Sequence, residues 1–162
     1  MQSPPKTTPP GQSRRPREPR LTPKTSWNTA LLVMLRWVVI IGGLVIIVDL
    51  GTQLIQQRMN GQDVGTELEQ ANLISNVVLF SILGAIVARQ TGVFYLAALA
   101  GLLASLLDGL VVAAAASMAP PPGEQAPVDV YLLTNVAYGT IPAAVSGFVS
   151  SLIERASGPR PK

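Results

Sequence analysis

The sequence contains neither cysteine nor histidine. Disulfides, thiolate nucleophiles, cysteine or histidine zinc ligands and an imidazole general base are therefore excluded. Charged residues are also scarce, at 13% of the 162 residues, whereas a soluble domain contains about a quarter. We expect no metal and no cofactor, and we expect much of the surface to face lipid.

Long apolar runs make up most of the chain. They cover residues 30–50, 71–88, 93–116 and 130–153, and a helix of about 20 apolar residues crosses a bilayer core. In the first run only Arg36 and Asp49 interrupt the apolar residues, and no A-x-A-like site follows it, so it is predicted to be an uncleaved anchor rather than a signal peptide. The sequence predicts an all-α integral membrane protein whose four-transmembrane-helix domain spans 30–153.

The segments that flank these runs alternate in charge. Residues 1–29 hold six basic residues and one acidic residue, and the tail 154–162 is also basic. The turn between the second and third runs contains Arg89 without an acid, whereas the two longer connections are acidic. By the positive-inside rule both termini are predicted to be cytoplasmic. A bacterial inner (plasma) membrane would suit these features.

The first 29 residues form a distinct segment with seven prolines and almost no large aliphatic side chains. Such a composition cannot bury enough apolar surface to fold, so a disordered tail that sets topology is predicted. The alternative is that RRPREPR, residues 14–20, docks on anionic lipid headgroups or on an acidic partner. No nucleic-acid motif is present, and no nucleic-acid partner is expected.

Two similar stretches lie 59 residues apart. LISNVV begins at Leu73 and LLTNVA begins at Leu132, and the same offset places Asp49 on Asp108 and Asn76 on Asn135. This pattern predicts two tandem two-helix hairpins, parallel repeats related by a pseudo-two-fold axis along the membrane normal. The alternative is convergent small and apolar composition.

Polar residues recur in the predicted outer third of all four spans. Two carboxylic acids and amide oxygens suit a proton or hard-cation site, whereas the structural alternative is hydrogen-bonding between helices. For Asp49 we favour a different structural interpretation, that its side chain lies in the membrane interface and touches water. For Asp108 the ion site and the hydrogen-bonding role both stay open. The candidate site residues are Asp108, Asn135, Asn76, Asp49, Asn72 and Tyr138.

Small residues repeat every four positions along the third and fourth spans, which allows helices to approach closely in lipid. These faces could also serve a second copy of the chain or a larger membrane complex. We therefore expect a non-catalytic accessory or assembly subunit, with a small proton- or cation-coupled transporter or channel as the alternative. The predicted packing residues are Ala97, Gly101, Ser105, Gly109, Gly139, Ala143 and Gly147.

An enzyme is not expected. The apolar spans contain no histidine, cysteine or lysine that could act as a nucleophile or base. The contexts of the two acids, VDLG at Asp49 and LDGL at Asp108, lack the G-x-G-D pattern of aspartyl intramembrane proteases.

Overall fold

The computed structural model describes residues 26–58, 65–118 and 128–157. In these segments the chain forms four α-helices, α1 (Trp27–Arg58), α2 (Gly65–Thr91), α3 (Phe94–Met118) and α4 (Val128–Ala156). All four are long and apolar enough to cross a membrane, which confirms the all-helical prediction. Most of the predicted N-terminal tail and the end of the C-terminal tail lie outside the described residues.

Each helix differs in length from its apolar run, most clearly α1. Ser26 caps its first turn, because the Ser26 hydroxyl oxygen accepts a hydrogen bond from the Thr29 amide at 3.3 Å. The helix therefore includes residues 27–29, which the sequence assigned to the tail, and it continues past Leu50 to Arg58. Leucine, glutamine and arginine are good helix formers, so the helix extends beyond the point where hydropathy falls.

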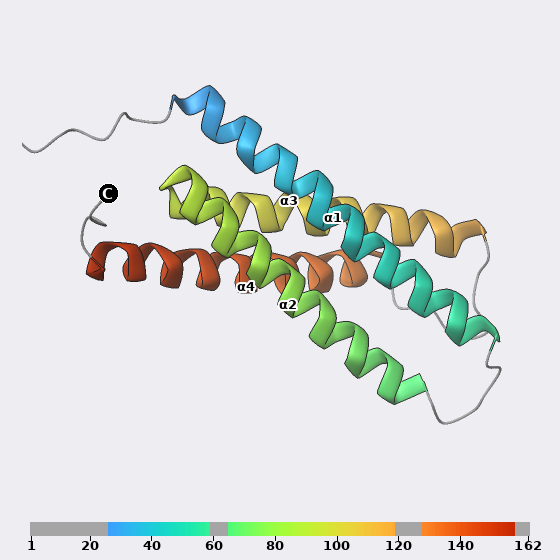
Figure 1. Ribbon diagram of the computed structural model, residues 1–162. Coiled ribbons are helices and arrows are strands. Elements are labelled where there is room, and N and C mark those ends of the chain that lie inside the picture. The colour runs from blue at the N-terminus through green and yellow to red at the C-terminus, as the bar shows by residue number, and fades with distance from the viewer. Residues whose placement is uncertain (1–25, 59–64, 119–127, 158–162) are drawn as a thin grey trace, which may run out of the picture.

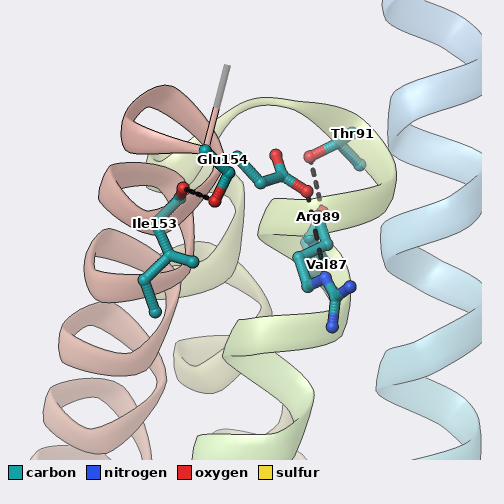
Figure 2. Close-up of polar contacts among 6 residues, drawn as sticks. Val87, Arg89, Thr91, Ile153 and Glu154 are labelled. Carbon is teal, nitrogen blue, oxygen red and sulfur yellow. Dashed lines mark hydrogen bonds and ion pairs between the residues drawn. The ribbon is translucent and has the colours of Figure 1, made fainter. Parts of the chain in front are cut away.

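A tight turn joins α2 to α3. Gly92 adopts a positive φ of 70°, a conformation that glycine reaches without strain, and its amide donates to the Ala88 carbonyl at 2.8 Å. The Thr91 hydroxyl donates to the Val87 carbonyl at 2.7 Å (Figure 2). It also accepts from the Val93 amide at 3.2 Å. These bonds satisfy backbone groups that the end of a helix would otherwise leave unpaired.

The start of α1, the α2–α3 turn and the end of α4 meet at one end of the molecule, which we call the terminal end (Figure 1). There Arg89 pairs with Glu154 at 3.8 Å across α2 and α4 (Figure 2). The Trp37 indole donates to the Gln90 side chain at 2.9 Å and so ties α1 to α2. The opposite end, where α1 leads to α2 and α3 leads to α4, is called the loop end.

The helices form two crossed pairs. α3 and α4 lie side by side, and α1 and α2 run obliquely across them (Figure 1). Within the described residues every pair of helices makes contact except α1 and α4. The apolar core lies between the pairs and includes the fully buried side chains of Val45, Phe80, Leu83, Val87 and Ala100.

Small residues let α4 approach α2 and α3 closely. A Cβ atom added to Gly101 would lie 2.6 Å from the Ala143 Cβ and 2.7 Å from the Gly139 carbonyl oxygen. A Cβ added to Gly139 would overlap Ser105. We call this contact the α4 seam, and it contains all the small residues singled out in the sequence, Ala97, Gly101, Ser105, Gly109, Gly139, Ala143 and Gly147, together with Gly84 of α2.

Candidate functional site at the loop end

Asp49 and Asn76 join α1 to α2. Asp49 is 6% exposed and Asn76 is 8% exposed, and the Asn76 Nδ2 donates to the Asp49 Oδ1 at 2.8 Å. Asp49 belongs to the buried face of α1, because it follows Ile41 and Val45 at helical spacing. An acid on an otherwise apolar face thus finds its amide partner on the next helix. The prediction that the Asp49 side chain touches water is wrong, because the packing of α1 against α2 buries it.

Asp108 and Asn135 make the corresponding connection between α3 and α4. Asp108 is completely buried, and the Asn135 Nδ2 donates to its Oδ2 at 2.8 Å. The same nitrogen lies 3.4 Å from the Ser105 carbonyl oxygen, one turn along α3. The two Asp–Asn bonds each join residues 27 positions apart.

The two acids also interact with each other. The Asp108 carboxyl group accepts the bond from Asn135 and lies close enough to Asp49 for the two acids to interact electrostatically. Within the described residues the single ion pair joins Arg89 to Glu154 at the terminal end, so neither acid has a cationic side-chain partner among them. Two carboxyl groups therefore share a buried region that holds no positive charge from the described chain.

Several buried oxygen atoms beside this pair have no hydrogen-bond partner in the described structure. They are the Oδ1 atoms of Asp108, Asn76 and Asn72. Each is a hydrogen-bond acceptor as placed, and leaving a buried acceptor unpaired costs about 1–3 kcal/mol. The group that would complete this region is therefore a hydrogen-bond donor or a cation.

A cavity of about 280 Å³ lies over the two Asp–Asn pairs. α1, α2 and α4 line it, and it lies at the loop end, where α1 and α4 do not touch. Asp108 does not line the cavity, but its neighbours Asn135 and Asp49 both do. The lining residues are Asp49, Thr52, Gln53, Gln56, Glu69, Asn72, Leu73, Asn76, Thr134, Asn135 and Tyr138.

The structure brings the six candidate residues of the sequence together. Five of them line the cavity, and Asp108 lies buried behind it. Sequence reasoning missed four polar residues of the wall, Thr52, Gln53, Gln56 and Glu69, because they lie outside the apolar runs and were counted as connections. Helical spacing could have identified three of these residues. Asp49, Gln53 and Gln56 fall on one face of a continuous helix, and so do Glu69, Asn72 and Asn76.

The described residues contain no group of three or more Asp, Glu, His or Cys side chains that could hold a metal ion. Comparison of the chain with protein-family models, with curated proteins and with solved structures finds no match. The function is therefore argued from the geometry of the cavity and its acids.

Proposed function

We propose that this protein is a small membrane transporter or channel that binds a proton or a cation at the Asp49–Asp108 pair. One observation carries this proposal: two neighbouring buried acids have no cationic partner among the described residues and lie beside unpaired acceptor oxygens at a cavity. An unpaired charge is costly in so buried a place. A proton held between the two acids, or a bound cation, would remove that cost.

The accessory role is the second candidate, and the two Asp–Asn bonds favour it. Each bond joins two helices, and side-chain hydrogen bonds in membranes contribute about 0.6 kcal/mol to helix association on average. This role explains the bonds, but it does not explain why the two acids are neighbours at a cavity. The accessory role was predicted from faces of small residues that could bind a partner. In the α4 seam these residues pack against one another within the chain, so they are not free for a partner.

The orientation that we propose places the terminal end in the cytoplasm and the cavity on the outer side. The support is the charge distribution: Arg36, Arg89 and Arg155 belong to the parts of the helices near the terminal end, whereas Glu67 and Glu69 belong to the start of α2 at the loop end. The positive-inside rule favours this direction.

Single cysteines can test the orientation without background, because the sequence contains none. In intact cells or sealed vesicles, a membrane-impermeant maleimide should label Glu67→Cys and should reach Ser157→Cys only after the membrane is opened. The reverse pattern would place the cavity in the cytoplasm and would contradict the proposed direction.

We also propose that the two hairpins are diverged repeats. The support is that Asp49–Asn76 and Asp108–Asn135 occupy equivalent positions at the offset of 59 and make the same bond. The helices depart from this symmetry in one respect. A two-fold axis would relate the α2–α3 contact to an α1–α4 contact, and the latter does not form. The cavity lies where that contact would be.

Flux through liposomes tests the proposed function. Purified wild type, reconstituted with a pH-sensitive dye inside, should carry protons, sodium or potassium, with the cation fluxes followed by an ion-sensitive dye. Asp108→Asn should abolish the flux, because it removes a fully buried acid. Glu67→Gln is the matched control, since it neutralises an acid of α2 that does not line the cavity. Folded wild type that conducts none of these ions and no small ammonium ion would refute the proposal.

A further inference from the structure

We infer that the cavity binds a small aliphatic diamine as a diammonium ion, with one ammonium at the Asp49–Asp108 pair and the other at Glu69. This inference rests on the proposed function, because it names the cation that the same site takes. It follows from the kind of atoms left unpaired, from the size of the cavity and from the position of a third acid at its wall.

The unpaired atoms favour an ammonium group. The Oδ1 atoms of Asp108, Asn76 and Asn72 are all acceptors, and all are buried without a partner in the described structure. A primary ammonium carries three donors and no acceptor. From the cavity it would supply a positive charge for the acids and donors for acceptors of the wall such as Asn72 and Asn76, whereas a neutral alcohol or amide would leave the charge unbalanced.

The volume favours an organic cation over a bare metal ion. The cavity measures about 280 Å³, which is just below the range of about 300–1,000 Å³ typical of ligand pockets. A dehydrated sodium ion would fill little of that space. A short aliphatic chain would fill more of it, and its second charged group would lie away from the first.

Glu69 provides the partner for that second charge. Glu69, Asn72 and Asn76 lie on one face of α2 and all line the cavity. Seven residues separate Glu69 from Asn76, which corresponds to about 10 Å along the helix. An extended four-carbon diamine spans about 6 Å between its nitrogens, and a hydrogen bond of about 2.8 Å at each end extends this to about 12 Å. The flexible Glu69 side chain can accommodate the difference between the length along the helix and the length of the hydrogen-bonded ligand.

The wall presents more apolar than polar surface although most of its side chains end in polar groups, which suits an aliphatic chain with charged ends. Amide and hydroxyl side chains dominate, Leu73 is the only aliphatic lining residue, and the cavity has no basic lining residue among the described residues. Tyr138 adds one aromatic ring, which can contact a cation through its face.

Titration calorimetry on the full chain in nanodiscs tests the inference, with 1,4-diaminobutane, butan-1-amine and sodium chloride as the probes. We expect 1,4-diaminobutane to bind about fivefold more tightly than butan-1-amine, which corresponds to the upper range for an exposed ion pair. Asp108→Asn should abolish binding of both amines. Glu69→Gln should lower the affinity for the diamine to that for the monoamine, and Glu67→Gln should change neither.

The outcomes separate the diamine inference from the proposed function. Sodium binding or ion flux that depends on Asp108, without amine binding, would overturn the inference and leave the proposed function in place. Equal affinities for the two amines, or a diamine preference that survives Glu69→Gln, would also overturn it. Glu69 is exposed, so its variant is expected to fold. Neither flux nor binding by folded wild type would refute both proposals.

Discussion

Replacing Gly139 by alanine tests the close approach of α4 to α3. The added methyl group would overlap the Ser105 side chain and come within 3.0 Å of the Phe80 ring. Neither neighbour can turn away easily, because Ser105 and Phe80 are both fully buried. Forcing an extra methyl group into such a contact costs about 1–3 kcal/mol.

Gly43→Ala is the matched control, because nothing lies within 4 Å of the added Cβ. Both variants make the same change within a helix, so the difference between them isolates the overlap. We expect Gly139→Ala to have the lower free energy of unfolding by about 1–3 kcal/mol, measured by circular dichroism during transfer from mild detergent into SDS. Gly42→Ala should have a free energy of unfolding close to that of the control, since its added Cβ would lie 3.4 Å from the Ala104 Cβ, an ordinary van der Waals contact. Equal stabilities for Gly139→Ala and Gly43→Ala would refute the described packing of the α4 seam.

The remaining predictions concern polar contacts between helices, measured by the same unfolding assay. A double-mutant cycle on Asp49 and Asn76 should give a coupling energy of about 0.6 kcal/mol and at most about 1.7 kcal/mol, and a value of zero would show that the bond does not form. Trp37→Phe should cost about 0.5–1.5 kcal/mol, because it removes the indole donor to α2. Arg89→Gln should cost less than about 1 kcal/mol, because the ion pair with Glu154 is exposed and 3.8 Å long, and a loss above 2 kcal/mol would contradict this description.

The helices could be predicted from the sequence because bilayer thickness sets a minimum length for an apolar run. The grouping of Asp49, Asn76, Asp108 and Asn135 could also be anticipated, because the offset of 59 places the two pairs at equivalent heights. Both inferences use local or repeated patterns, which a single sequence contains.

The shape of the cavity could not be predicted in this way. It depends on α1 and α4 not touching, and that is a property of how the hairpins cross. Gln53, Gln56 and Glu69 join the wall because α1 and α2 continue as helices beyond their apolar runs. Hydropathy marks where side chains prefer lipid, but the backbone can stay helical in water, so polar helical extensions are counted as loops.

The pairing of each acid within its own hairpin has a consequence for how the chain enters a membrane. Asp49 obtains its hydrogen-bond partner from α2, the next helix to be synthesised, and Asp108 obtains its partner from α4. Each hairpin can therefore mask its own acid as soon as its second helix arrives, before the two halves meet. A hairpin that enters a bilayer as a pair would expose no lone carboxyl group to lipid.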